Sequence, residues 1–204
     1  MTYVRISIIS AIIIAGIILF KGLRMQEVEV FDIKAIIGLG NPGPKYAGNR
    51  HNIGFKIVER LAERYGVLWD IKPKMEVTKI NINGKNIILV KPQTFMNTSG
   101  QVIPFLQKQG IKAENILVVH DELEFPFGKV KIRQGGSARG HNGLRSIIQG
   151  CGKDFVRLRF GIGRPPIKVM VGNYVLQNFS EPSGQIEELI DESADMIEAL
   201  FSEN

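Results

Sequence analysis

From Ile33 onward, the chain alternates short apolar runs with segments whose apolar residues have helical spacing. The apolar runs, which suit buried strands, are residues 33–39, 116–119 and 156–162. The segments with apolar side chains three and four residues apart are residues 52–65, 102–110, 142–148 and 185–201. This alternation predicts an α/β fold: a single domain with a mixed, twisted central β-sheet flanked by helices on both faces.

Two shorter patterns explain why the sheet should be mixed. The dipeptide Asn83-Gly84 lies between two β-prone runs, residues 77–82 and 86–90, and is typical of a two-residue hairpin. Residues 129–133 alternate polar and apolar side chains as a further short strand. A hairpin pairs its strands antiparallel, whereas strand-helix-strand units pair them parallel, so both kinds of pairing are expected.

The composition is that of a globular protein. Of 204 residues, 44% are hydrophobic and 23% are charged, which excludes a disordered chain, a collagen and a coiled coil. The single cysteine, Cys151, can form no internal disulfide and suggests no sulfur-ligated metal site. We therefore expect a cytoplasmic protein.

The first 24 residues differ from the rest of the chain. Residues 6–20 are an apolar run flanked by Arg5, Lys21 and Arg24, and no signal-peptide cleavage pattern follows it. A helix of this length spans about 22 Å, short of the ~30 Å hydrocarbon core of a bilayer. Residues 1–24 are either an upstream extension, with Met25 as the true start, or a membrane anchor. The folded domain is expected within residues 25–204.

Charge is distributed unevenly along the second half of the chain. Residues 123–168 contain ten Lys and Arg against two acidic residues, and residues 169–204 contain eight acidic residues and no Lys or Arg. A segment of one sign is a candidate surface for a polyanion such as nucleic acid. On charge alone, a solvated face balanced by the acidic C-terminal segment explains the pattern equally well.

A glycine motif at the end of the first strand matches the dinucleotide-binding pattern G-x-G-x-x-G at residues 38–43. That pattern needs a helix to begin inside the motif and an acidic residue at the end of the next strand. Here Pro42 and Pro44 prolong a loop, and the acidic residues at the expected distance, Glu59 and Glu63, lie in a predicted helix. We therefore expect no nucleotide cofactor, and a tight turn that holds Asn41 at the strand end.

Polar residues recur where the predicted strands end and the helices begin. They are Asn41, His51, Asn52, Asn97, His120, Asp121, His141 and Asn142. Because ligands of open α/β sheets bind beyond the carboxyl ends of the strands, these side chains are expected to form a polar pocket. Each also has a structural explanation: Asn97 could cap a helix, Asn41 could serve its turn, and His51 could simply begin a helix.

Five motifs occur in a characteristic order. They are GLGNPG (38–43) with Tyr46 and NRHNIG (49–54), KPQTFMNTSG (91–100), VHDEL (119–123), GGSARGHNG (135–143) and RLRFGIGRP (157–165). Together they resemble the bacterial-type peptidyl-tRNA hydrolases, and the resemblance covers residues 33–201. It implies hydrolysis of the ester bond between a peptide's C-terminus and the 3′-terminal ribose of tRNA, which releases free tRNA and peptide. The apolar N-terminal segment is a departure from the family.

The candidate catalytic residues are His51 and Asp121. Ester cleavage by water needs a base that works near neutral pH, and the imidazole of His51 is our candidate. Asp121 is the candidate acceptor that fixes the histidine tautomer. The resemblance assigns substrate binding to Asn41, Tyr46, Met96, Asn97, His141 and Asn142. We expect direct attack by water, without a metal or another cofactor.

The basic segment gives six candidate tRNA-binding residues: Lys129, Lys131, Arg133, Arg139, Arg145 and Arg159. Contacts with the phosphates of the acceptor stem and 3′ end would position any tRNA without reading its bases. We expect peptidyl-tRNA as the partner of a monomeric enzyme, with a membrane contact only if residues 1–24 are an anchor. The alternative is a non-catalytic RNA- or partner-binding protein on the same scaffold, which the presence of His51 and Asp121 disfavours.

Overall fold

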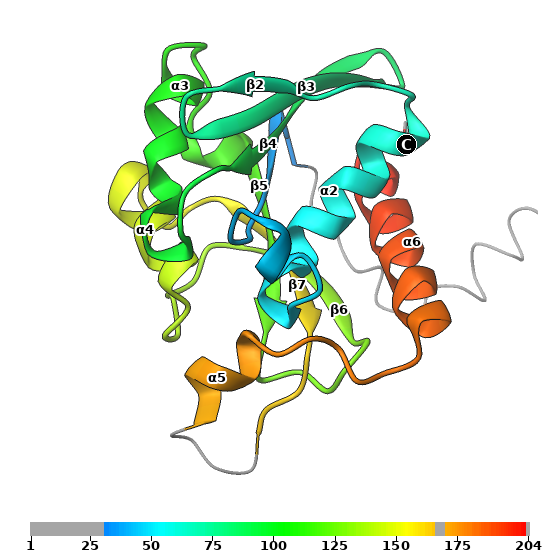
Figure 1. The fold of residues 1–204 in the computed structure, drawn as a ribbon. Coiled ribbons are helices and arrows are strands. Elements are labelled where there is room, and N and C mark those ends of the chain that lie inside the picture. The colour runs from blue at the N-terminus through cyan, green and yellow to red at the C-terminus, as the bar shows by residue number, and fades with distance from the viewer. Residues whose placement is uncertain (1–30, 166–169, 203–204) are drawn as a thin grey trace, which may run out of the picture. The chain divides into compact units, whose positions relative to one another are not determined.

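The structure is a computed structural model that describes residues 31–165 and 170–202 (Figure 1). The predicted extension, residues 1–24, lies outside the described residues, and its two interpretations stay open. The described residues form one seven-stranded sheet in the order β2-β3-β4-β1-β5-β7-β6. Strand β1 pairs parallel with β4 and β5, β5 pairs parallel with β7, and β2-β3, β3-β4 and β6-β7 are antiparallel. The predicted α/β fold with a mixed sheet is confirmed.

The strands are short, and they have these bounds: β1 Ala35–Gly38, β2 Asp70–Lys72, β3 Met75–Ile82, β4 Lys85–Pro92, β5 Ile116–Glu122, β6 Val130–Gln134 and β7 Val156–Gly161. At the predicted hairpin, Asn83 and Gly84 have φ angles of 49° and 82°. Both angles are in the left-handed region that a two-residue hairpin turn requires, which is why this dipeptide suits the position.

Helices cover both faces of the sheet (Figure 1). Helices α2 (Ile53–Arg64) and α6 (Ser183–Ala199) lie on one face, and α3 (Ile103–Gln107) and α4 (Asn142–Cys151) lie on the other. Neighbouring residues of β1 belong to the two separate cores: Ile36 packs with the α2 and α6 side and Ile37 with the α3 and α4 side. Among the described residues, no helix has the length and apolar character needed to cross a membrane.

Several elements differ from the sequence-based expectation. Strand β5 continues to Glu122, so His120, Asp121 and Glu122 are buried within a strand and do not follow it. The expected helix at 102–110 ends at Gln107 and is preceded by a 3-10 helix, η4 (Met96–Val102). The pattern gave no sign of β2, whose residues are all exposed, or of the five-residue helix α5 (Val171–Val175).

Two glycines bring α2 close to the centre of the sheet. A Cβ atom on Gly38 would lie 2.4 Å from the carbonyl oxygen of Gly54, and one on Gly54 would lie 2.4 Å from that of Val119. Only glycine permits these approaches. The start of α2, together with the 3-10 helix η3 (Arg50–Asn52) before it, is thereby held against the carboxyl-terminal half of β5.

Candidate active site

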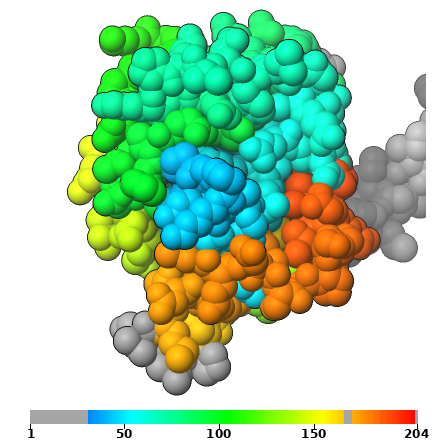
Figure 2. Space-filling view, viewed as in Figure 1, coloured from blue at the N-terminus to red at the C-terminus, as the bar shows by residue number. Residues whose placement is uncertain are grey.

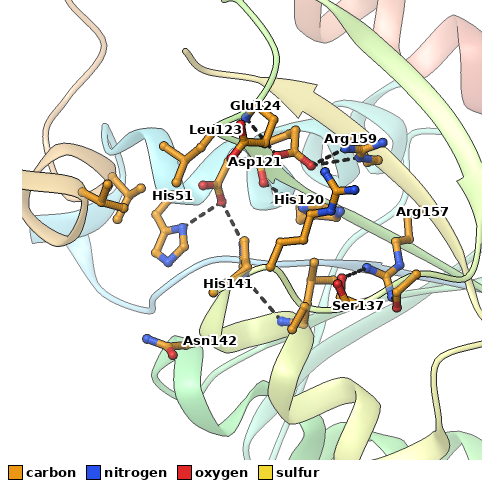
Figure 3. A pocket seen from close by; sticks show the side chains of 18 of the residues that line it. His51, His120, Asp121, Leu123, Glu124, Ser137, His141, Asn142, Arg157 and Arg159 are labelled. Atoms are coloured by element: carbon orange, nitrogen blue, oxygen red, sulfur yellow. Dashed lines mark hydrogen bonds and ion pairs between the residues drawn. The ribbon is translucent and has the colours of Figure 1, made fainter. Parts of the chain in front are cut away.

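A cavity of about 370 Å³ opens beside the end of β5 (Figure 3). Its lining comes from η3, β5, β6, β7, α5, the start of α4 and the loops between them. It includes His51, His120, Asp121, Arg133, His141, Asn142, Arg157 and Arg159. The prediction that polar residues meet at this end of the sheet is therefore correct for five of the eight positions. Asn41 and Asn52 line a second pocket of about 230 Å³, and Asn97 is exposed.

His51 and Asp121 are in direct contact. Nδ1 of His51 lies 2.7 Å from Oδ1 of Asp121, and both residues are buried. Burial raises the pKa of Asp121, but the nearby His51 and His141 outweigh it and hold that pKa well below the ordinary value. Because the carboxylate is ionised, Nδ1 of His51 donates to it. The other nitrogen, Nε2, then has the lone pair that a general base needs.

A second imidazole bonds to the same carboxylate oxygen. Nε2 of His141 lies 3.0 Å from Oδ1 of Asp121, so the rings of His51 and His141 both point to one atom (Figure 3). His141 is also the N-cap of α4: its Nδ1 accepts a hydrogen bond of 3.3 Å from the backbone N–H of Leu144. An N–H can only donate, so the ring proton of His141 is on Nε2.

His120 is a site residue that the catalytic and substrate-binding predictions did not include. Its Nδ1 donates to the carbonyl oxygen of Asp121 at 2.7 Å, and its Nε2 has no hydrogen-bond partner among the described residues. The pKa of His120 is lowered to about 3, mainly because the ring is buried and also because His141 lies next to it. His120 is therefore neutral near neutral pH. The only sequence signal was its place in a polar run at the end of a buried strand.

Asn41 and Asn52 tie the loop after β1 to the start of α2. The side chain of Asn52 accepts from the backbone N–H of Asn41 at 3.0 Å and donates to its carbonyl oxygen at 2.9 Å. Oδ1 of Asn41 accepts from the backbone N–H of Met96 at 2.8 Å. Asn41 thus stabilises the turn in which it lies. Of its polar groups, only the side-chain NH₂ remains free to bind a ligand.

The other predicted substrate-binding residues differ in accessibility. Tyr46 is half-buried and packs edge-on against the exposed Phe95, with ring centroids 6.3 Å apart. Met96 is buried against the core beneath α4. Asn97 is exposed. No side chain caps η4, so Asn97 is not the helix cap that the sequence allowed. Asn142 is exposed at the mouth of the cavity.

The predicted tRNA-binding cations fall into two groups. Lys129, Lys131, Arg133, Arg139 and Arg145 are accessible, and the first three flank or belong to the edge strand β6. Arg159, which Figure 3 shows beside Asp121, is buried instead. Its Nε and Nη2 donate to Oε2 of Glu122 at 2.9 and 2.7 Å. Its charge is therefore already matched by a carboxylate.

Arg157 is a further cation of the cavity that the prediction left out. It is buried, and it donates to the backbone carbonyl groups of Gly136 and Ser137. Burial and the nearby Arg133 and Arg159 lower its pKa to about 10. Arg157 therefore lies on the same side of the cavity as the exposed Arg133 and the paired Arg159 and Glu122.

Arg50, next to His51, fixes the segment after α5. Its guanidinium donates to the backbone of Asn178, to Ser180 and to Glu181, and it lies over the ring of Tyr174. Figure 2 shows the atoms of this segment (orange) directly beside those of the loop after β1 (blue). The element that carries His51 is therefore held from two sides.

Three ligand atoms of His51, Asp121 and His141 lie within 4.8 Å of one another, a spacing that a metal could use. A metal at Nε2 of His141 would move the ring proton to Nδ1, where it would face the N–H of Leu144. The second hydrogen bond of His141 therefore does not favour a metal. A metal-free site stays a prediction.

Comparison with known proteins identifies the family. A model described as "Peptidyl-tRNA hydrolase" matches residues 35–204. The chain belongs to the peptidyl-tRNA hydrolase family. It is 46% identical to the peptidyl-tRNA hydrolase of Geotalea daltonii over 175 residues, and the matched region covers 84% of this chain and 91% of that relative. It is 45% identical over 174 residues to that of Chloroflexus aggregans, which covers 82% and 92%.

The solved structures agree with this membership in the peptidyl-tRNA hydrolase family. The crystal structure of the peptidyl-tRNA hydrolase from Acinetobacter baumannii matches with a TM-score of 0.75 and 41% identity, over 84% of this chain and 87% of that one. The predicted family is confirmed, and so is the function as a hydrolase of the ester bond in peptidyl-tRNA. The family favours this catalytic function over a non-catalytic binding protein on the same scaffold.

Proposed function

We propose that His51 is the general base of this peptidyl-tRNA hydrolase and that Asp121 orients it. The observation that carries the proposal is the 2.7 Å contact between Nδ1 of His51 and Oδ1 of Asp121. Nε2 of His51 takes a proton from water, and the resulting hydroxide attacks the ester carbonyl carbon. Asp121 stabilises the imidazolium that forms, and the proton then passes to the leaving 3′-oxygen of the ribose.

Side-chain amides supply the neutral donors that a tetrahedral intermediate needs. Asn142 lines the same cavity as His51, and its Oδ1 already accepts from Arg145 at 3.2 Å. Its NH₂ group is therefore the donor that we assign to the oxyanion. Asn41, whose Oδ1 is occupied by Met96, and the exposed Asn97 are proposed to hold the peptide main chain or the terminal adenosine.

The tRNA is proposed to lie along β6 and the rim of the cavity. Lys129, Lys131 and Arg133 are exposed at this edge strand, and Arg139 and Arg145 are exposed around the cavity mouth. These five cations would contact phosphates of the acceptor stem. Arg159 acts instead through its pair with Glu122, which holds the wall next to Asp121.

The enzyme is further proposed to act as a monomer, without a metal, in the cytoplasm. The location is supported by the substrate of the family, because peptidyl-tRNA is a product of translation. The test of the proposed chemistry is release of an N-blocked aminoacyl group from tRNA, with free aminoacyl-tRNA as the control. A His51 variant that cleaves as fast as the natural protein would overturn the assignment of the base.

A further inference from the structure

His141 lies beside the proposed base but does not contact it by a hydrogen bond. The centroids of the two imidazole rings are 4.8 Å apart, and each ring bonds separately to Oδ1 of Asp121. One carboxylate oxygen thus accepts two hydrogen bonds, from Nδ1 of His51 at 2.7 Å and from Nε2 of His141 at 3.0 Å. A change in the hydrogen bond from His141 to Asp121 should therefore change the interaction of Asp121 with His51.

The tautomer of His141 is fixed by the helix that it caps. Its Nδ1 accepts from the N–H of Leu144, the third residue of α4. A proton on Nδ1 would remove this cap and would place a positive charge at the positive end of the helix dipole. The helix N-terminus therefore favours the tautomer of His141 that donates from Nε2 to Asp121.

A neutral donor on Asp121 has two effects on the base. It holds the carboxylate in the orientation that His51 needs. It also draws negative charge from Oδ1, so that Asp121 stabilises a protonated His51 less than an unshared carboxylate would. A smaller fraction of His51 is then protonated at a given pH, and the free base is available at lower pH.

We propose that His141 is a positioning residue for the hydrolysis, whose neutral, helix-capped imidazole orients Asp121 and lowers the pH at which His51 becomes a free base. This inference rests on the proposed role of His51. It differs from the substrate-binding role expected for His141, because it requires contact with Asp121 and none with the substrate.

Other charged or titratable groups face this pair, and His120 is the one whose pKa His141 also lowers, after burial. They are His120 and Glu122 on β5, Arg133 on β6, Arg157 and Arg159 on β7, and Glu124, Arg139 and Arg164 on the adjoining loops. Arg50 beside His51 is paired with Glu181. His120, with its pKa of about 3, stays neutral throughout the range in which activity would be measured.

Two substitutions separate the two hydrogen bonds of His141. In His141→Asn, the amide oxygen can take the place of Nδ1 and keep the cap, but the side chain is too short to reach Asp121. In His141→Gln, the amide nitrogen can take the place of Nε2 and keep the bond to Asp121, while the cap is lost. The experiment is single-turnover cleavage of N-acetylated aminoacyl-tRNA from pH 5 to 8, with the melting temperature of each variant.

We expect the activity of the natural protein to rise with pH through one midpoint. In His141→Asn, that midpoint should move up by about 0.5 to 1 pH unit, the equivalent of one hydrogen bond. In His141→Gln, the midpoint should stay and the melting temperature should fall. An unshifted midpoint in His141→Asn, or the same shift in both variants, would overturn the inference. A flat profile for the natural protein would instead contradict the proposed role of His51.

The ring of His141 gives a second test that does not depend on any variant. Nitrogen-15 chemical shifts of the natural protein should show a proton on Nε2 and none on Nδ1 from pH 5 to 8. A ring that becomes doubly protonated in this range would overturn the proposal, because the helix cap would then not hold the imidazole neutral.

Discussion

Oδ1 of Asp121 lies 2.7 Å from Nδ1 of His51, although 70 positions separate the two residues along the chain. The contact depends on the sheet order, because β1 and β5 are neighbours and α2 packs across both. It also depends on Gly38 and Gly54, which let the start of α2 approach the strands. His51 and Asp121 are thus brought together by backbone packing and not by a local motif.

Replacing Asp121 by Asn should keep the fold and reduce the rate. An amide that turns its NH₂ group toward His51 places the ring proton on Nε2, where the base needs a lone pair. We expect kcat to fall by about 10²- to 10⁴-fold, the range of a general base. The measurement is kcat together with the melting temperature. A variant that keeps a tenth or more of the natural kcat would show that Asp121 does not orient the base.

The edge strand β6 should contribute to binding and not to chemistry. With Lys129, Lys131 and Arg133 all replaced by Gln, KM for whole peptidyl-tRNA should rise while kcat hardly changes. Each lost phosphate contact should reduce the slope of log KM against log salt by roughly 0.7 to 0.9.

A short substrate with only the terminal adenosine and its peptide is the control for the β6 prediction. The variant and the natural protein should cleave it equally, because it does not reach these cations. If kcat falls for both substrates and the salt slope is unchanged, the strand supports the cavity and the tRNA lies on another face.

The buried His120 should make the fold sensitive to acid. The pKa of His120 is about 3 in the folded protein, whereas the ordinary histidine value, taken for the unfolded chain, is 6.5. Between about pH 6.5 and 3, His120 is therefore protonated in the unfolded chain but not in the folded protein. The free energy of unfolding should therefore fall as pH falls from about 6.5 toward 3. This part of the slope is roughly 1.4 kcal/mol per pH unit.

His120→Asn is the matched variant for this measurement, because its amide can still donate to the carbonyl oxygen of Asp121. Urea unfolding at pH 7, 6, 5 and 4 should give a shallower pH dependence for the variant. Parallel curves for the variant and the natural protein would show that His120 is not held neutral. Asp121 contributes separately: its lowered pKa stabilises the fold above about pH 4, and this contribution is lost in stronger acid.

A chain that begins at Met25 should fold and hydrolyse peptidyl-tRNA at the natural rate. The reason is that the residues that the structure describes, from Phe31 onward, already form a sheet, two cores and the cavity. Solubility and kcat of the long and short chains are the measurements. Aggregation or inactivity of the short chain would show that residues 1–24 are part of the working protein.

The features that the sequence predicted are those that local patterns encode. The Asn83-Gly84 turn depends only on two residues and their φ angles, and α2 and α6 depend on apolar spacing along one face. The meeting of His51 with Asp121 could be anticipated because Asp121 lies near the carboxyl end of a strand and His51 lies directly before a helix, and ligand sites of α/β sheets form at that edge.

The remaining features depend on partners that are distant in the chain. The bond of Arg159 to Glu122 exists only because β7 pairs with β5, so the sequence could not distinguish this buried cation from the exposed cations of β6. The two hydrogen bonds of the His141 ring likewise need both the start of α4 and the end of β5. Strand β2, with three exposed residues, had no pattern to detect.

The most direct test of the account is the rate of peptide release from N-acetylated aminoacyl-tRNA by the natural protein and by His51→Ala. We expect rapid release by the natural protein, little cleavage of free aminoacyl-tRNA, and a loss of about 10²- to 10⁴-fold in kcat for the variant. Its free energy of unfolding should stay within about 1 to 2 kcal/mol of the natural value. A folded His51→Ala protein that keeps a tenth or more of the natural kcat would contradict the account.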